Sequence, residues 1–145
     1  MVSLSHRINL ISRCSAMYRA KCSSAQLPGI YHSYVLAICA HPGWSQDRLA
    51  RHCCLNKSSV TRHLTYLEEN GYIRRAVGET DKREMLVYPT EKMLNIQPEV
   101  MRITKEWNAK ITEGISEEDF SRFMDILGTM YNSAYKITHG EEVCE

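Results

Sequence analysis

The chain has 145 residues, a formal net charge of +1 and a mean hydropathy of −0.37, which suits one globular domain or a small domain with an added oligomerisation element. Its 7 glycines and 4 prolines exclude collagen-like and low-complexity classes. We find neither a membrane span nor a secretory signal, and so expect a cytoplasmic protein with 6 free thiols.

Charge is distributed unevenly along the chain. Residues 1–63 carry a net charge of +7, residues 64–112 are neutral, and residues 113–145 carry −6. A basic half followed by an acidic one is compatible with nucleic-acid binding, but also with an ordinary solvated surface.

Apolar residues recur at helical spacing through the first half of the chain. Breaks occur at Leu27-Pro28-Gly29 and at His41-Pro42-Gly43. Ser45 and Asn56 are good N-caps, and Gly71 suits the position just after a helix. We therefore expect four helices, over about residues 6–23, 30–39, 45–53 and 56–70.

The pattern changes after residue 71. Residues 72–76 and 85–88 are typical of two short strands, with the polar loop 78–83 between them. Two strands this close in sequence predict an antiparallel hairpin.

Two further helices are predicted in the last third of the chain. One runs over about residues 91–112, with Thr90 as its cap and a kink or broken start at Pro98. The other follows Ser116-Glu117-Glu118-Asp119, which resembles a capping box. The terminal helices carry more apolar residues than one stripe can bury, so the surplus predicts contact with a second copy.

Residues 45–89 are the most informative part of the sequence. Two helices joined by Cys54-Leu55-Asn56 fit a helix-turn-helix, and the small Ala50 lets their backbones approach closely. The hairpin that follows makes this a winged helix. The predicted fold class is therefore mostly α with a small β hairpin.

The fourth helix has two distinct faces. At 100° per residue, Val60, Leu64 and Leu67 share the core side. A helix entering a major groove needs short hydroxyl side chains, donors to phosphate and an arginine that can fork onto guanine. The flanks and the opposite face offer this set: Lys57, Ser58, Ser59, Thr61, Arg62 and Thr65. The alternative is an exposed polar helix face without a partner.

The sequence resembles the MarR (multiple antibiotic resistance regulator) family. The resemblance lies in residues 49–64 and 67–73 and in the wing 80–92, where Asp81-Lys82-Arg83 fits the family's D-x-R pattern. It extends over about residues 8–135. Two departures concern the turn, where Cys54 stands in place of the usual Gly or Asn and Cys53 in place of a core Leu.

The resemblance implies a homodimer that binds a pseudo-palindromic operator. Residues 1–29 and 91–145 would form the dimerisation region and residues 30–90 the DNA-binding lobe. Arg83, with Lys82 beside it, would approach the minor groove, held by Asp81, since a narrow minor groove attracts arginine. An ordinary turn salt bridge is the alternative for this pair.

The implied function is a transcription regulator, most simply a repressor that a small-molecule effector releases from DNA. Two alternatives remain open, a cysteine-based redox sensor and a protein-interaction module that binds no DNA. Candidate effector-pocket residues are Tyr18, Tyr31, His32 and Tyr34, although each also suits plain packing. Candidate redox thiols are Cys14 and Cys22.

Catalysis and metal binding find little support in the sequence. No phosphate-binding, dinucleotide, nucleophile-elbow or zinc-protease motif occurs, so we expect no enzyme and no cofactor. His52-Cys53-Cys54 is a weak metal candidate, because adjacent ligands at a helix end diverge.

Overall fold

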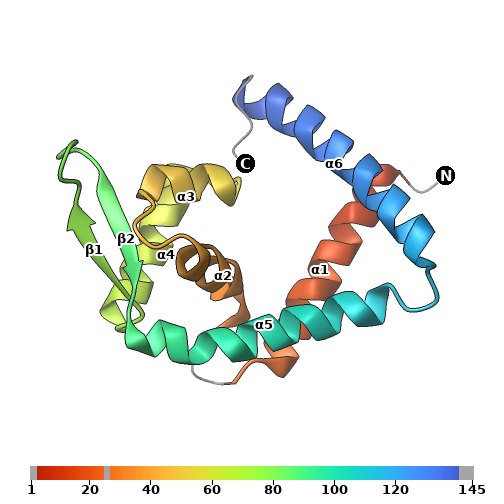
Figure 1. Cartoon of the computed structure of the whole chain (residues 1–145), viewed down its shortest axis with the longest axis horizontal. Coiled ribbons are helices and arrows are strands. Elements are labelled where there is room, and N and C mark those ends of the chain that lie inside the picture. The colour runs from red at the N-terminus through yellow and green to blue at the C-terminus, as the bar shows by residue number, and fades with distance from the viewer. Residues whose placement is uncertain (1–2, 25–26, 141–145) are drawn as a thin grey trace. The chain divides into compact units, whose positions relative to one another are not determined.

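The computed structural model describes residues 3–24 and 27–140, which are mostly helical with one two-stranded antiparallel sheet (Figure 1). The elements are α1 (Leu4–Cys22), the 3₁₀ turn η1 (Gly29–Tyr31), α2 (His32–Ala40), α3 (Gln46–His52), α4 (Lys57–Glu69), β1 (Ile73–Val77), β2 (Met85–Pro89), α5 (Glu91–Ile111) and α6 (Glu117–His139). The chain forms two compact units, Met1–Trp107 and Asn108–Glu145, so α5 begins in the first and ends in the second. This order confirms the predicted mostly helical, winged-helix fold class.

The helix starts lie where the capping residues predict them. The Ser45 side chain accepts a hydrogen bond from the Arg48 amide at 3.2 Å at the start of α3. Asn56 accepts from the Ser59 amide at 2.8 Å at the start of α4. Each cap satisfies an amide that the helix itself leaves without an acceptor.

Two local predictions need correction. Strand β1 lies one residue later than predicted, whereas β2 begins at Met85 as predicted and includes Pro89, which pairs with Ile73. The helix is not broken at Pro98, because α5 runs without interruption from Glu91 to Ile111. The Thr90 hydroxyl contacts the carbonyl oxygens of Gly71 and Tyr72, at 2.7 and 2.9 Å, and so ties the start of α5 to the end of α4.

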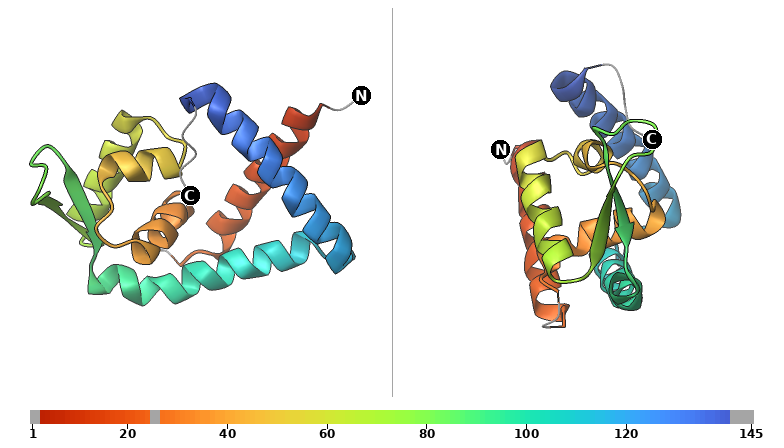
Figure 2. Two further views of the ribbon diagram at one scale, coloured as in Figure 1. Left: turned by 45° about the horizontal axis from the view of Figure 1, so that its top comes forward. Right: turned by 90° about the vertical axis from the view of Figure 1, so that its left-hand side faces the viewer.

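The core of the first unit lies where α2, α3 and α4 pack against the hairpin (Figures 1 and 2). Val60, Leu64 and Leu67 are all buried, as the helical spacing predicts. From α3, Leu49 and Ala50 join them. The opposite face of α4 is thereby turned to solvent.

Helices α3 and α4 end in the same backbone motif. After α3, the Cys54 amide donates to the Arg51 carbonyl and the Leu55 amide donates to the Ala50 carbonyl. After α4, Gly71 and the following residue make the equivalent bonds. This motif requires one residue with a left-handed backbone conformation, and φ is accordingly 51° at Cys54 and 77° at Gly71.

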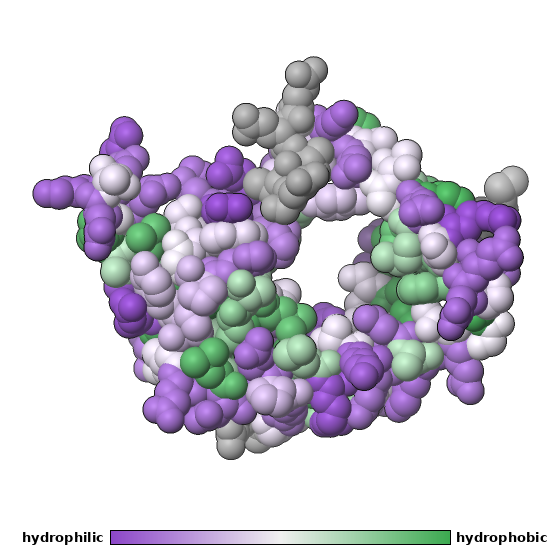
Figure 3. Space-filling view, in the orientation of Figure 1, coloured by the Kyte–Doolittle hydropathy of each residue, from purple (hydrophilic) through white to green (hydrophobic). Residues whose placement is uncertain are grey.

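The terminal helices keep apolar side chains on the surface. No residue of α1 is buried, and in α6 only Tyr135 is buried among the residues that the structure describes. Apolar surface is visible over these helices in Figure 3. Within the described ranges, none of the helices combines the length and apolarity needed to cross a membrane.

Candidate nucleic-acid interface

The solvent face of α4 carries the side chains predicted for a major groove. Lys57, Ser58, Thr61 and Arg62 are exposed, and Ser59 is partly exposed. The first turn of α4 contains no acidic residue. The positive end of the helix dipole therefore lies beside this hydroxyl-rich, basic surface, which suits phosphate oxygens.

Several of these side chains are already oriented by local hydrogen bonds. The Ser58 hydroxyl donates to the Asn56 side chain at 2.8 Å, and the Thr61 hydroxyl donates to the Lys57 carbonyl at 2.9 Å. The Lys57 ammonium pairs with Asp47 of α3 at 3.1 Å, an exposed pair that solvent screens. Arg62 makes no ion pair with the residues that the structure describes.

The wing holds Arg83 in a defined position at its tip. The Asp81 carboxylate accepts from the Arg83 amide at 3.0 Å and from its guanidinium at 3.1 and 3.3 Å. The Arg83 side chain nevertheless remains 91% exposed. Hydrogen bonds from Arg83 lower the pKa of Asp81, so the pair stays charged at neutral pH.

Gly78 lets the wing loop close tightly. Its amide donates to the Glu84 carbonyl at 2.9 Å, and a Cβ there would lie 2.5 Å from the Asp81 carbonyl oxygen. The loop therefore needs a residue without a side chain at this close approach, and the hairpin presents Lys82 and Arg83 to solvent at its end.

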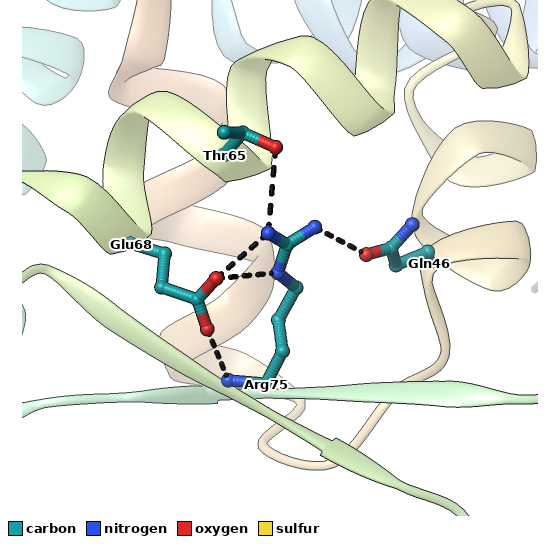
Figure 4. Close-up of polar contacts among 4 residues, drawn as sticks. All are labelled: Gln46, Thr65, Glu68 and Arg75. Atoms are coloured by element: carbon teal, nitrogen blue, oxygen red, sulfur yellow. Dashed lines mark hydrogen bonds and ion pairs between the residues drawn. The ribbon is translucent and has the colours of Figure 1, made fainter.

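Arg75 of β1 connects the hairpin to both helices of the helix-turn-helix (Figure 4). Its guanidinium donates to Glu68 of α4 at 2.7 and 3.0 Å and to Gln46 of α3 at 2.9 Å. It also donates to the Thr65 hydroxyl at 3.3 Å. Thr65, a predicted DNA contact, is thus partly buried and engaged within the lobe.

No sequence pattern identifies this Arg75 cluster, which consists of Gln46, Thr65, Glu68 and Arg75, because its members come from three different elements. The hydrogen bonds from Arg75 hold the pKa of Glu68 below its ordinary value. The carboxylate therefore stays ionised, and its pairing with Arg75 offsets its negative charge.

The structure brings two of the four candidate effector residues together, because Tyr31 and Tyr34 both pack edge-on against His63, with ring centres 5.6 and 5.5 Å apart. Tyr34 lies in the wall of a surface pocket of about 360 Å³. Tyr31 stacks on Tyr66, with ring centres 4.6 Å apart. Tyr18 packs against Trp107, with ring centres 5.4 Å apart.

The fourth candidate, His32, is buried at the junction of α1 and α2. The Ser23 hydroxyl donates to the Arg19 carbonyl at 2.6 Å, so it accepts from His32 Nε2 at 3.0 Å. His32 Nδ1 is buried and has no partner among the described residues. Burial and the nearby Arg19 lower the pKa of this histidine, while Glu99 opposes the shift.

The two candidate redox thiols lie on α1. Cys14 is exposed and Cys22 partly buried, and the cysteines of the described ranges are all free. Across those same ranges, no group of three or more histidine, cysteine or carboxylate side chains could hold a metal ion.

The chain is similar in sequence and in fold to known regulators of transcription. Residues 32–85 match the model of the MarR family. A MarR family transcriptional regulator from Listeria monocytogenes, solved with a 26mer DNA, is 21% identical, with a TM-score of 0.87 and 100% of each chain covered.

Two further structures agree in fold. The transcriptional regulator SlyA is 24% identical over 92% of this chain and 95% of its own, with a TM-score of 0.81. The PcaV transcriptional regulator from Streptomyces coelicolor, in complex with its natural ligand, is 15% identical over 90% of this chain and 93% of its own, with a TM-score of 0.79. The chain therefore has the fold of the MarR transcriptional regulators, and its residues 32–85 carry the sequence of the MarR family.

Proposed function

We propose that this protein is a sequence-specific regulator of transcription that binds double-stranded DNA. The observation that carries the proposal is the solvent face of α4, where hydroxyl side chains and Arg62 surround a helix start free of acidic residues. The wing adds a second basic contact at Arg83, oriented by Asp81. A relative of the same fold has been solved with DNA.

We propose further that the protein acts as a homodimer on a pseudo-palindromic operator. Exposed apolar side chains along α1 and α6 support this, because large apolar surfaces are usually buried against another protein surface. Two-fold symmetry would present two copies of α4 to successive major grooves about one helical turn apart.

The simplest regulatory scheme is a repressor that leaves its operator when a small molecule binds. The PcaV regulator is bound to its natural ligand in its structure, and the pocket beside Tyr34 has the volume of a small-molecule site. A ligand that prefers the conformation unable to bind DNA would shift the population away from the operator. A reporter gene behind a selected operator gives the sign of regulation, and transcription that rises with the regulator would contradict repression.

Variants of the two arginines test the proposed groove contacts. A duplex is first selected from random DNA with the full chain. We expect Arg62→Ala to weaken binding to that duplex by about 1–3 kcal/mol and to relax the preference at one base pair. Arg83→Ala should weaken binding chiefly at A·T-rich flanks, where the minor groove is narrow. Fluorescence anisotropy on a panel of duplex variants measures both effects.

Arg122→Ala serves as the matched control, since Arg122 is an exposed arginine of α6 that pairs with Glu118. Its affinity for the duplex should stay at the wild-type value. Wild-type affinity in the Arg62 variant, or failure to select any duplex at low salt, would contradict DNA binding and favour a protein-interaction module.

A further inference from the structure

The pocket beside the turn between α3 and α4 contains a thiol. Its walls come from η1, α2, the end of α3, the turn that follows and α4, and Figure 1 shows these helices within the lobe. Ile30, Tyr34 and Leu55 supply apolar surface, and Cys53 and His63 supply polar groups. A volume of about 360 Å³ can hold a single aromatic ring with its substituents.

A second thiol follows directly in the chain. Cys53 is partly buried in the pocket wall, and Cys54 is exposed. Backbone hydrogen bonds of 2.9 Å from the Cys53 amide to Leu49 and 3.1 Å from the Cys54 amide to Arg51 hold both residues in place. They are the only adjacent cysteines in the sequence, and Cys54 is close enough to Cys53 to act on its thiol electrostatically. Divergence of neighbouring side chains counts against a site that needs three or four convergent ligands, but an atom that needs only two thiols places a weaker demand on their direction.

Two other uses of these thiols fit the structure poorly. A divalent metal needs three or more ligands, and the described residues provide no such group. Oxidation by peroxide needs a thiolate, whereas burial and the neighbouring Cys54 raise the pKa of Cys53 and keep it a thiol. A ligand that reacts with neutral thiols and needs two of them fits better.

We propose that Cys53, Cys54 and this pocket bind a trivalent aryl arsenical, with arsenic bridging the two sulfur atoms and the aryl group lying in the pocket. The reacting form is an aryl arsenic dihydroxide. Two arsenic–sulfur bonds form and two arsenic–oxygen bonds break. The two thiol protons leave with the two hydroxides as water, and arsenic remains trivalent, so no oxidant or reductant is needed.

A ligand in this pocket would also affect α4, the helix that carries the proposed DNA contacts. The Tyr34 hydroxyl and His63 Nδ1 both line it and lie 3.0 Å apart, within hydrogen-bond distance, and His63 is the neighbour of Arg62 on α4. An aryl group between α2 and α4 would replace that hydrogen bond and move the solvent face of α4. This effect on DNA rests on the proposed function, whereas arsenical binding does not.

Intact-protein mass spectrometry with phenylarsine oxide tests the site. We expect one adduct per chain that survives a wash with the monothiol glutathione and is removed by a dithiol, because a two-point attachment resists competition by single thiols. Cys53→Ser and Cys54→Gly should each lose the wash-resistant adduct, while Cys14→Ser and Cys22→Ser should keep it. A resistant adduct that persists in the Cys54→Gly protein would overturn the proposal, and so would its absence from the wild type. Glycine suits the left-handed backbone at residue 54, so that variant keeps the fold.

The contribution of the pocket to binding is tested by comparing the affinities of phenyl and methyl arsenicals. Burying a ring against apolar walls should make the phenyl compound bind about tenfold more tightly, or better. Equal affinities would overturn the placement of the aryl group in the pocket.

The selected duplex then gives a separate readout. Phenylarsine oxide should release the wild type from DNA and leave Cys54→Gly bound. Release of both proteins, or of neither, would overturn the coupling to α4. A wild type that forms the adduct but binds no duplex would refute the proposed function and leave the arsenical site standing.

Discussion

Residues 54 and 71 occupy the same left-handed position after consecutive helices, yet only one of them is glycine. The sequence indicates this position at Gly71 because glycine is the usual residue just after a helix, and at Cys54 because the MarR resemblance expects Gly or Asn there. A side chain at φ 51° brings its Cβ close to the following carbonyl, so Cys54 stores local strain that Gly71 avoids.

Replacing Cys54 by glycine should therefore stabilise the protein. Relief of the left-handed strain, about 1–2 kcal/mol, exceeds the entropy that glycine adds to the unfolded chain, about 0.5–1 kcal/mol. We expect a net gain of about 0.5–1 kcal/mol by urea denaturation. Asn70→Gly is the control, since φ is −91° there and glycine should bring no gain. Equal or lower stability in Cys54→Gly would refute the strain argument.

The buried His32 makes stability depend on pH. Its folded-state pKa is lowered, so the unfolded chain binds the proton more readily than the folded one. The histidine's contribution to stability is fully present above its ordinary pKa of 6.5, which the unfolded chain has, and is lost as the pH falls through the folded-state pKa.

We expect the unfolding free energy to fall as the pH drops below 6.5 and to fall less steeply in His32→Gln. The glutamine variant serves as the control because it cannot titrate. His63, whose pKa is also lowered, preserves part of the slope in that variant. Urea titrations at a series of pH values measure the difference, and identical slopes in the two proteins would contradict the assignment.

At the scale of elements, the Arg75 cluster determines how the wing sits against α3 and α4. Arg75→Met keeps the aliphatic stem but leaves Glu68 without its ion pair. We expect a loss of about 1–2 kcal/mol in unfolding free energy, moderated because Glu68 is partly exposed. The backbone amide of residue 75 also donates a hydrogen bond to the Glu68 carboxylate. Without the Arg75 guanidinium that carboxylate should be less ordered, so the amide should exchange its hydrogen with solvent faster.

Arg74→Met is the matched control on the same strand. The Arg74 guanidinium lies 4.2 Å from the ring centre of Tyr88 and is exposed, so its loss should cost about 0.5 kcal/mol. Similar losses in the two variants would mean that the cluster adds nothing beyond an ordinary surface arginine.

The parts of the fold that follow from local rules could be predicted from the sequence, and those that need tertiary contacts could not. The polar face of α4 follows from helical spacing around Val60. Gln46 and Arg75, by contrast, are 29 residues apart, and no pattern relates them. Pro98 predicts a break that does not occur, because buried Ile96 and Val100 anchor α5 on both sides of it.

On the scale of the whole molecule, the exposed apolar faces predict self-association. We expect sedimentation equilibrium to give about twice 16.7 kDa. Phe123 and Ile126 of α6 are 53% and 56% exposed, so Phe123→Glu should place a charge in the interface and shift the protein to monomer. Ser121→Glu, on the exposed surface of the same helix, should remain a dimer. A wild type that stays monomeric would refute the symmetric arrangement on DNA.

The hydrogen bonds between Asp81 and Arg83 have an entropic consequence. A free arginine side chain loses about 2 kcal/mol of rotamer freedom when it is immobilised. Here most of that loss occurs while the wing folds, long before any nucleic acid arrives. In the proposed complex with DNA, Arg83 would therefore lose less rotamer freedom on contact than an unpaired arginine would.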